Sequence, residues 1–499
     1  MPGPSAAPDF EVLIIGAGFS GLGMAIRLKQ AGRDDFAIFE RETALGGAWH
    51  ANTYPGCTCD VPSHLYSFSF APNPDWTRLF SPQAEIRAYL ERCAVEYGVK
   101  PHIRFDSEIV EARFNEDSGL WRVRTGNGKV VTARNVVAGL GPLSRPAFPN
   151  IPGLDRFAGK VFHSQQWDHG YDLSGKTVAV LGTGASAIQF VPQIAPKVGK
   201  LHLFQRTPPW IVPKPDQPIS RKERSQFSRH PALQRFVRYF IYWLLEARVL
   251  GFVFKPGLLK ILQRQAERLL LQQVRDPVLR ARLTPDYALG CKRVLTANDY
   301  YPALSRDNVA LETCGIRKFT ESALITNDGR EIPVDAVILG TGFHVTDGVP
   351  RGMIFGRGGR DIVDAWAQGT EAYKGTTISG YPNFYQMTGA NTGVGHTSLV
   401  FMIECQIAYA LDGIRTRARR RLKFMDVRPE VQRVYNQRLQ ARMAGTIWNT
   451  GGCKSWYFDK NGKNATQWPG FSWQFRLMTR RFDAASYEQV QGTQSGERA

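Results

Sequence analysis

The sequence predicts an α/β protein in which one unit of strand, turn and helix occurs twice. An apolar strand pattern over 11–15 runs directly into Gly16-Ala-Gly18-Phe-Ser-Gly21, and a second over 176–181 runs into Gly182-Thr-Gly184-Ala-Ser-Ala187. Both turns lead into helical patterns. A third apolar strand over 335–339 closes on another glycine turn, which returns the chain toward its first unit. Strands that alternate with helices favour parallel sheets, with the second unit inserted into the first.

The first glycine turn has the composition of a phosphate-binding loop. Gly16 permits the tight turn, Gly18 lets a pyrophosphate approach the backbone, and Gly21 lets the helix pack on the strand. The helix start adds unpaired N–H groups and a positive dipole end. A second strand over 36–39 ends in Glu40, which lies 40 − 16 = 24 residues after the first glycine. A carboxylate at that distance can bind an adenosine ribose, so this unit is predicted to bind a dinucleotide.

The second turn carries the opposite charge at the same offset. The residue 206 − 182 = 24 positions after Gly182 is Arg206. A carboxylate repels a 2′-phosphate, whereas an arginine fork binds it. We therefore expect FAD or NAD in the first unit and NADP in the second, a pairing typical of electron transfer from NADPH to flavin. The alternative for Arg206 is an ordinary solvated surface arginine.

These observations predict an α/β fold with two Rossmann-like dinucleotide-binding domains, one for FAD and one for NADP, and a helical insertion. The insertion is rich in Leu, Arg, Gln and Phe at helical spacing, and its prolines at Pro231, Pro256, Pro277 and Pro285 are interpreted as helix stops. It could form a lid or simply pad the domain. The predicted boundaries are 1–145 and 346–499 for the split FAD-binding domain, 146–213 and 292–345 for the NADP-binding domain, and 214–291 for the insertion.

A further glycine-containing segment, Asn391-Thr-Gly-Val-Gly395-His396, leads into a helix predicted over 398–411. The positive end of this helix could face the pyrimidine edge of a flavin and stabilise the reduced, anionic flavin. The alternative is an ordinary capped helix.

Composition limits the classes of partner. With 63 Lys+Arg against 44 Asp+Glu among 499 residues the net charge is +19, and 43% hydrophobic residues exclude a disordered chain. A basic protein can bind nucleic acid, an anionic membrane or phosphate-bearing ligands. Interleaved basic and aromatic recognition patterns are not evident, so no nucleic-acid partner is expected. Charged residues interrupt the most apolar stretch, 236–254, which predicts a buried or interfacial helix and no transmembrane span. Contact of the basic insertion with a membrane surface stays open.

The seven cysteines are scattered, without a CxxC pair or a His-rich tract. We therefore expect neither a disulfide framework nor a metal site. The first ten residues lack the basic and apolar regions of a secretion signal. A reducing, cytoplasmic location is predicted.

Two longer motifs carry a family resemblance. Phe157-Ala-Gly159-Lys-Val-Phe-His163-Ser-Gln-Gln-Trp167-Asp168 matches the pattern FxGxxxHxxxW followed by Pro or Asp, and Gly46-Gly-Ala-Trp49-His-Ala-Asn-Thr-Tyr54-Pro-Gly56-Cys-Thr-Cys-Asp60 resembles GGxWxxxxYPGxxxD. The chain thereby resembles the type I Baeyer–Villiger monooxygenases over essentially residues 10–482. The resemblance implies FAD, NADPH, O2 and a small-molecule ketone. It further implies that one oxygen atom is inserted beside the carbonyl, through a C4a-peroxyflavin, to give an ester or lactone.

The resemblance also implies site residues. The family's active-site arginine maps onto Arg293, where a guanidinium would stabilise the anionic flavin peroxide and the oxyanion that follows, and Asp60 maps onto the acid that pairs with it. Without the resemblance, Arg293 would be interpreted as a surface ion-pair residue. The fingerprint residues Phe157, Gly159, His163 and Trp167 are interpreted as positioning the NADP domain, with His163 not acting as a general base. The alternative for His163 is a buried histidine with satisfied hydrogen bonds.

The predicted cofactor contacts fall into two sets. The flavin set is Gly16, Gly18, Gly21, Glu40, Ala48, Trp49, Asp60, Tyr66 and Val110. The NADP set is Thr183, Gly184, Ala185, Ser186, Ala187, Gln189, Arg206, Thr207 and Lys292.

Three other functions compete with this interpretation. A flavin monooxygenase that oxidises nitrogen or sulfur shares both glycine turns, but its substrates form no oxyanion for Arg293 to stabilise. A flavin disulfide reductase needs a paired redox motif, and Cys57-x-Cys59 has the wrong spacing. A flavin-bound sensor without turnover would not need Arg293, Asp60 and Lys292. The class of ketone, whether cyclic, linear, aromatic or steroidal, and the oligomeric state stay open.

Overall fold

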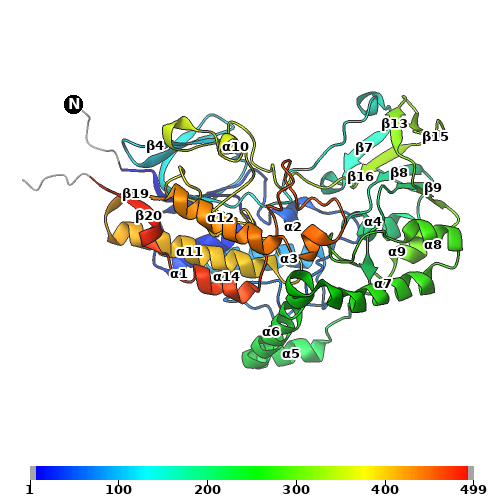
Figure 1. Cartoon of the computed structure of the whole chain (residues 1–499), viewed down its shortest axis with the longest axis horizontal. Helices are drawn as coiled ribbons and strands as arrows, with labels where there is room; N and C mark the ends of the chain where they lie inside the picture. The colour runs from blue at the N-terminus through cyan, green and yellow to red at the C-terminus, as the bar shows by residue number, and fades with distance from the viewer. Residues whose placement is uncertain (1–6, 493–499) are drawn as a thin grey trace, which may run out of the picture.

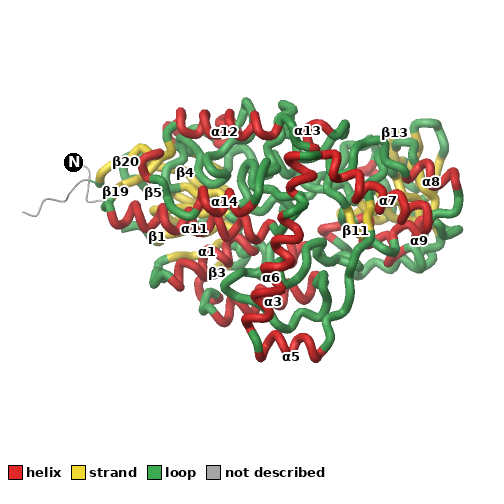
Figure 2. The backbone as a smooth tube through the Cα atoms, turned by 60° about the horizontal axis from the view of Figure 1, so that its bottom comes forward, coloured by secondary structure: helices red, strands yellow, loops and turns green. Residues whose placement is uncertain are grey.

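The computed structural model describes residues 7–492 as two α/β lobes lying side by side (Figure 1). Each lobe has one main sheet, and helices cover the sheets (Figure 2). The lobe on the left of Figure 1 holds both ends of the described chain, and the lobe on the right is built from its middle. We call them the first and the second lobe.

The first lobe is built around an eight-stranded sheet. Its strands are β1 Phe10–Ile15, β2 Phe36–Phe39, β3 Ile103–Arg104, β4 Ile109–Asn115, β5 Leu120–Thr125, β6 Val130–Ala138, β17 Ile354–Phe355 and β18 Phe384–Gln386. They follow the order β17-β4-β5-β6-β1-β2-β3, and β18 also pairs with β6. Strand β1 is parallel to β2 and β6, with Ile15 opposite Phe39 on one side and Ala138 on the other. Burial on both faces explains why the sequence of β1 is continuously apolar.

Helices cover this sheet, and the C-terminal part of the chain supplies most of them. The helices are α1 Phe19–Gln30, α2 Ala48–Ala51, α3 Gln83–Glu96, α10 Ile362–Ala365, α11 Leu399–Arg419, α12 Pro429–Met443, α13 Ile447–Thr450 and α14 Ser472–Thr479, and a hairpin pairs β19 Leu422–Val427 with β20 Tyr487–Gln491. Helix α11 runs eight residues beyond the predicted end at 411, and the Ser398 side chain caps its start by accepting from the N–H of Val400 at 3.2 Å.

The second lobe has a five-stranded, fully parallel sheet. Its order is β12-β9-β8-β16-β7, formed by β7 Lys160–His163, β8 Thr177–Leu181, β9 Lys200–Phe204, β12 Val309–Glu312 and β16 Ala336–Leu339. Helices α4 Ala187–Ile194 and α9 Tyr300–Leu304 pack together, and β13 Ile316–Phe319, β14 Ala323–Thr326 and β15 Glu331–Pro333 form a small antiparallel sheet.

Two segments connect the lobes and lie against each other. The N–H of Ala147 donates to the carbonyl of Gly342 at 2.9 Å, and the N–H of His344 donates to the carbonyl of Arg145 at 2.9 Å. The strands of the two main sheets fall on either side of the predicted boundaries at 145/146 and 345/346. We call this crossing segment the hinge, because it is where the chain passes between the lobes.

The insertion is helical and starts from the second lobe. It consists of α5 Arg221–Arg229, α6 Pro231–Glu246, a π-helical turn at Leu250–Phe254, α7 Leu259–Gln273 and α8 Pro277–Leu283, bracketed by the pair β10 Ile211–Val212 and β11 Leu295–Thr296. The interpretation of Pro231 and Pro277 as helix stops was wrong, because they begin α6 and α8. Proline is tolerated in a first helical turn since its missing N–H would have no partner there.

A disulfide joins two distant parts of the chain and corrects the expectation from the sequence. Cys291 and Cys453 are bonded, with their Cα atoms 6.1 Å apart and a sequence separation of 162 residues. Such a separation leaves no local pattern from which the pairing could be predicted. The disulfide fixes the segment that precedes Lys292 and Arg293 to the loop after α13.

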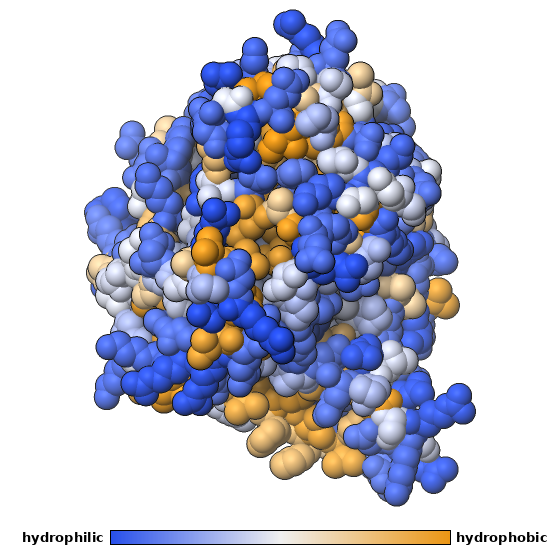
Figure 3. All heavy atoms as spheres, turned by 90° about the vertical axis from the view of Figure 1, so that its right-hand side faces the viewer, coloured by the Kyte–Doolittle hydropathy of each residue, from blue (hydrophilic) through white to orange (hydrophobic). Residues whose placement is uncertain are grey.

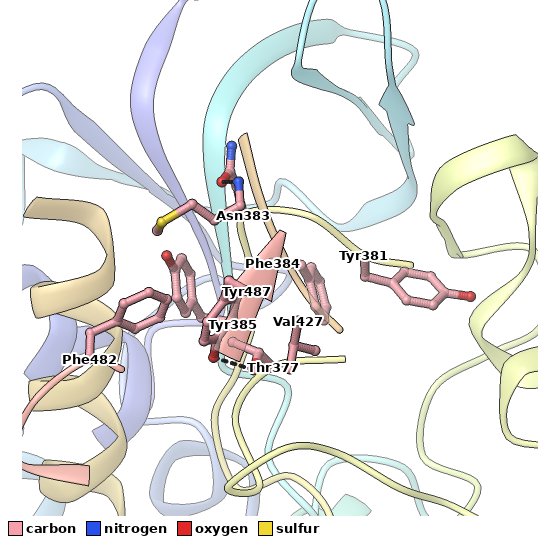
Figure 4. A pocket seen from close by; sticks show the side chains of 9 residues that line it. Thr377, Tyr381, Asn383, Phe384, Tyr385, Val427, Phe482 and Tyr487 are labelled. Carbon is pink, nitrogen blue, oxygen red and sulfur yellow. Dashed lines mark hydrogen bonds between the residues drawn. The ribbon is translucent and has the colours of Figure 1, made fainter. Parts of the chain in front are cut away.

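One internal void is too small for a ligand. A void of about 10 Å³ lies among β18, β19 and β20, where the Tyr487 and Thr377 hydroxyls are 2.8 Å apart (Figure 4). It has room for one water at most, so no cofactor binds there.

Within residues 7–492, no helix is both long enough and apolar enough to cross a membrane.

Candidate active site

The first glycine turn is shaped by close backbone contacts. A Cβ on Gly21 would lie 1.8 Å from the carbonyl oxygen of Gly16, and Gly16 itself has φ +91°. The Glu40 carboxylate sits beside the turn, where it accepts from the N–H of Ala17 at 2.6 Å and from that of Glu42 at 3.0 Å. The turn and the acid therefore lie next to each other, as a dinucleotide pyrophosphate and ribose require.

A cleft of about 510 Å³ opens beside the end of β2. Arg41, Glu42 and His50 line one side of it, and residues of the connecting segment and the second lobe line the other. The N–H of Ser107, two residues before β4, donates to the Glu40 carbonyl at 2.8 Å, so this strand begins close to Glu40. Val110 is the second residue of β4 and therefore lies nearby. The cleft thus leaves open space next to Glu40, where the adenosine half of a dinucleotide would lie.

Helix α2 lies against the same turn and carries Ala48 and Trp49. A Cβ on Gly18 would lie 3.5 Å from the Cα of Gly47, so the start of α2 approaches the turn closely. The indole N–H of Trp49 donates to the Tyr66 hydroxyl at 3.1 Å, and the two rings pack edge to face. Two predicted flavin contacts thus form one aromatic wall near the phosphate-binding turn.

The second glycine turn is more open. Gly182 has φ +107°, and a Cβ there would lie 2.4 Å from the carbonyl oxygen of Gly340. By contrast, a Cβ on Gly184 would meet no atom within 4 Å, and both Gly184 and Ala185 are exposed. The space in front of Gly184 is what a pyrophosphate needs at the second glycine of this motif. The Thr183 hydroxyl donates to the carbonyl of Thr207 at 3.3 Å, which links the turn to the segment of Arg206.

Two cations come together beside this turn. Partial burial and the positive charge of Arg206 lower the pKa of Lys292 below its usual range. Because like charges are unfavourable together without an anion, this pair suits a phosphate group. The Arg206 side chain is exposed to solvent. The Lys292 ammonium lies 4.8 Å from the ring centre of Tyr287. Arg206 and Lys292, two of the predicted 2′-phosphate residues, are therefore near enough for their charges to interact, and Thr207 follows Arg206 in the chain.

The candidate catalytic pair forms across the two lobes. Arg293 donates from Nε at 2.7 Å and from Nη2 at 2.6 Å to the same oxygen of Asp60, Oδ2. The negative charge of Asp60 raises the pKa of Arg293 above its usual value. The two side chains keep 32% and 29% of their surface accessible, so a small molecule can reach the pair. The guanidinium is therefore permanently charged, fixed by a carboxylate and open to a ligand.

Buried polar atoms also gather around the loop before α11. The following atoms are buried and have no hydrogen-bond partner among residues 7–492: Asn391 Oδ1, Thr397 Oγ1, Trp448 Nε1 and Gln467 Oε1. Asn391 and Gln467 are in contact, since the Asn391 amide donates to the Gln467 carbonyl at 2.9 Å, and a Cβ on Gly395 would lie 3.4 Å from the Trp448 indole nitrogen. Buried polar atoms of this kind need partners. A polar ring edge such as that of a flavin would supply them, which fits the expectation for the loop before α11.

His163 holds the hinge between the lobes. Its Nδ1 accepts from the N–H of Gln165 at 3.1 Å, so Nε2 carries the proton and donates to the carbonyl of Gly342 at 3.1 Å. Burial lowers the pKa of His163, which keeps the ring neutral. The glycine of the same fingerprint has no room for a side chain, because a Cβ on Gly159 would lie 2.4 Å from the Phe157 ring. These contacts support a positioning role and leave no free nitrogen for a general base.

Gln189 joins the lobes directly. Its side-chain oxygen accepts from the Tyr54 hydroxyl at 3.1 Å and from the N–H of Thr58 at 3.3 Å, and its amide donates to the Thr58 carbonyl at 3.1 Å. Trp167 packs on Phe190 next to it, with the ring centres 5.3 Å apart. Gln189 was predicted as an NADP contact, but in this structure its amide ties α4 to the segment that leads to Asp60.

Comparisons with known proteins agree with this geometry. The model of the family described as flavin-binding monooxygenase-like matches residues 10–348. A Baeyer–Villiger monooxygenase of Pseudomonas aeruginosa is 54% identical over 98% of this chain and 93% of its own length. The chain belongs to the Baeyer–Villiger monooxygenases. A second member of this family, from Streptomyces coelicolor, is 48% identical over 96% of this chain and 92% of its own length.

Solved structures of Baeyer–Villiger type share the whole fold. A complex of OTEMO with FAD and NADP has a TM-score of 0.86 at 26% identity, and cyclohexanone monooxygenase from Rhodococcus sp. Phi1 with NADP+ has a TM-score of 0.85 at 26% identity. Each comparison covers 97% of this chain and all of the other. The predicted α/β fold with two dinucleotide-binding domains is thereby confirmed, and the flavin-binding family and these complexes bear out FAD and NADP as cofactors.

Sequence reasoning missed parts of this Baeyer–Villiger site. Burial raises the pKa of Tyr457, and the charges of Arg293 and Asp60 act on this pKa in opposite directions, so its hydroxyl lies near the pair. Lys214 donates to the Thr58 hydroxyl at 2.7 Å, and Cys291 is fixed by its disulfide just before Lys292. None of these residues stands in a motif. Their common signal is spatial, because each becomes visible only when distant segments meet.

Proposed function

We propose that the protein is an FAD- and NADPH-dependent Baeyer–Villiger monooxygenase that inserts one oxygen atom of O2 beside a ketone carbonyl, giving an ester or lactone. The observation that carries the proposal is the Arg293–Asp60 pair, which joins distant segments of the chain. The family relationship supports the same reaction. When bound, NADPH supplies the hydride and FAD the electrons that activate O2.

Arg293 stabilises negative charge on oxygen during the reaction. Asp60 occupies the edge of the guanidinium formed by Nε and Nη2, and no described residue accepts from Nη1. Nη1 therefore remains for an oxygen of the substrate, where a fixed donor lowers the energy of a developing oxyanion. Asp60 sets the plane of the guanidinium, so this donor needs no reorganisation during the reaction.

The other site residues bind NADPH or keep the interface between the lobes closed. Arg206 and Lys292 hold the 2′-phosphate of NADPH, which selects it over NADH. The Gln189 bridge keeps the lobes together over the reacting groups, and the His163 contact fixes the connecting segment at Gly342. A closed interface excludes water, which protects an activated oxygen species from release as hydrogen peroxide.

A ketone panel tests this function. Cyclic, linear, aromatic and steroidal ketones are each incubated with protein and NADPH, while NADPH loss, hydrogen peroxide and product mass are followed together. We expect at least one ketone to accelerate NADPH loss and to yield a product heavier by one oxygen atom, in proportion to the NADPH used. The matched control is a panel of amines and sulfides. Faster turnover of these, without any ester, would assign the protein to nitrogen or sulfur oxygenation instead.

The same proposal covers the partners and the location. The expected small-molecule partners are a ketone and O2, and a cytoplasmic location stays a prediction from the sequence. Contact with a membrane surface, which the sequence left open, would involve a different face of the molecule.

A further inference from the structure

Helix α6 has apolar side chains on two opposite faces. Its inner face buries Ile241, Tyr242 and Leu245 in the core of the first lobe. At 3.6 residues per turn, six large side chains fall on the opposite side of the helix. These residues, each between 40% and 66% exposed, form the α6 patch: Leu233, Phe236, Tyr239, Phe240, Trp243 and Leu244. The packing of this protein thus uses only one of the two apolar faces.

Helix α6, which carries the patch, lies at the lower edge of the molecule in Figure 1, near the middle of its long axis. Apolar side chains gather along the lower edge of the face in Figure 3, at the height where α6 lies in Figure 1. Scattered single apolar residues are normal on a protein surface, but a contiguous group of this size marks a contact site.

The inner contacts hold α6 in a fixed position. The buried Glu246 carboxylate accepts from the N–H of Ser472 and, at 2.8 Å, from its hydroxyl. Arg238 donates to the carbonyl of His64 at 2.7 Å, and Gln234 donates to that of Asn73 at 2.5 Å. The outer face is therefore presented on a rigid support and is not a frayed segment that folds inward.

The charges around the α6 patch are basic. Exposed Arg221, Lys222 and Arg229 lie on α5, which packs against α6, and exposed Arg235 lies on α6 itself. The segment 221–246 has only two acids. Glu223 is held by both the hydroxyl and the N–H of Ser220 in a capping box, and Glu246 is buried. An occupant of this face must accordingly offer apolar contact together with negative charge.

We propose that the α6 patch docks the protein on an anionic membrane surface. Phenylalanine, tryptophan and leucine would enter the boundary between headgroups and acyl chains, while the cations of α5 would contact lipid phosphates. A second copy of the chain fits less well, because a symmetric contact would bring two basic surfaces together. The helix has 16 residues and lies along the protein surface, so it rests on the membrane and does not cross it.

Vesicle flotation tests this docking. The holoprotein is mixed with vesicles of phosphatidylcholine alone or of phosphatidylcholine with phosphatidylglycerol, at low and high salt. We expect binding to the anionic vesicles only, weakened by salt because exposed charges are screened. Replacing Phe240→Ser and Trp243→Ser together should lower the binding constant roughly tenfold or more. Lys222→Ala with Arg229→Ala should also lower it roughly tenfold or more, and should reduce the salt effect.

Controls separate docking from loss of structure. Val278→Ser changes a residue of the same insertion with 59% exposure, outside the α6 patch, and should bind vesicles like the parent. All variants should keep bound FAD, the same unfolding temperature and the same turnover of a soluble ketone. Absence of binding to any vesicle, or equal binding by the Phe240→Ser and Trp243→Ser variant, would overturn the proposal. So would light scattering that shows a dimer which this variant dissociates, since a second copy would then cover the patch.

Discussion

Arg293 is held through two of its nitrogens by a single oxygen of Asp60. That arrangement fixes the orientation of the guanidinium and leaves Nη1 for a ligand, while the nearby carboxylate keeps the arginine charged. Lysine could not take its place, since an ammonium lacks the planar fork that meets a carboxylate and a ligand at once. One side chain therefore combines permanent charge with a defined direction.

Removing the Arg293 side chain should separate flavin reduction from ester formation. In Arg293→Ala we expect NADPH still to reduce the flavin, because Arg206 and Lys292 are unchanged, whereas ester formation falls by about 100-fold or more. Rapid-mixing absorbance measures the reduction, and product mass measures the ester. Arg317→Ala, an exposed arginine on β13, is the control. Retained ester formation in Arg293→Ala would contradict the assignment.

The cofactor preference depends on a second arginine. Arg206→Ala should raise the KM for NADPH by roughly 10- to 100-fold, the loss expected for one charged hydrogen bond, and should leave the KM for NADH nearly unchanged. Steady-state kinetics with both cofactors measures the ratio. Lys318→Ala, on the same lobe, controls for a general loss of positive charge. An equal effect on both cofactors would show that Arg206 does not contact the 2′-phosphate.

Short elements, and not only single side chains, hold the site together. Strand β7 places His163 against the connecting segment at Gly342, and the disulfide fixes the loop after α13 to the segment before Lys292. Both contacts lie beside the candidate site without belonging to the cofactor sets. They determine how the two lobes and the Arg293 segment are positioned.

The histidine of the hinge should act by position and not by proton transfer. Burial lowers the pKa of His163, so the ring stays neutral as the pH falls through the usual histidine range of about 6.5. His163→Gln should therefore lower turnover and increase hydrogen peroxide release, yet keep the shape of the acid limb of the pH–rate profile. His102→Gln, in the first lobe, is the control. Disappearance of the acid limb in His163→Gln would show general-base chemistry instead.

The disulfide should stabilise the folded chain. Cys453→Ser is expected to reduce the free energy of unfolding by about 2–4 kcal/mol, because the closed loop spans 162 residues. Denaturant unfolding measures the change, and a thiol reductant should reproduce it in the parent but not in the variant. Cys314→Ser removes a free cysteine as the control. Peptide mapping that found both Cys291 and Cys453 as free thiols, together with unchanged stability, would contradict the pairing.

Across the whole molecule, the features that the sequence predicted without the family resemblance are those with a local signal, whereas the Arg293–Asp60 pair was predicted from the resemblance. The strand, glycine turn and helix at Gly16 and at Gly182 each lie within one short segment, and Arg206 lies at a fixed offset from its turn. The disulfide, the Gln189 bridge and the position of Tyr457 depend on contacts between distant segments, which a single sequence does not show. The prolines were misinterpreted for another reason. Proline both ends helices and begins them, so position in the fold decides between the two.

The interface between the lobes can be tested where Gly56 lies close to the backbone of Gln189. Gly56 has φ +79°, and a Cβ there would lie 2.7 Å from the carbonyl oxygen of Gln189. Gly56→Ala should lower the free energy of unfolding, by about 1–2 kcal/mol through backbone strain and by about 1–3 kcal/mol through the clash. It should also raise hydrogen peroxide release. Gly128→Ala has a similar φ of +86° but meets no atom within 4 Å, so it isolates the strain. Equal unfolding temperatures and equal coupling of NADPH to product in both variants would show that this contact does not hold the lobes.

The split sheet of the first lobe has a consequence for the newly made chain. Strands β17 and β18 add to β4 and β6 only after the entire second lobe and the insertion have been translated. Early in synthesis the nascent sheet is therefore incomplete, with edges that other chains could pair with. A released chain that ends just before residue 354 should therefore contain every strand of the second lobe's main sheet, but a first lobe that proteases still cut.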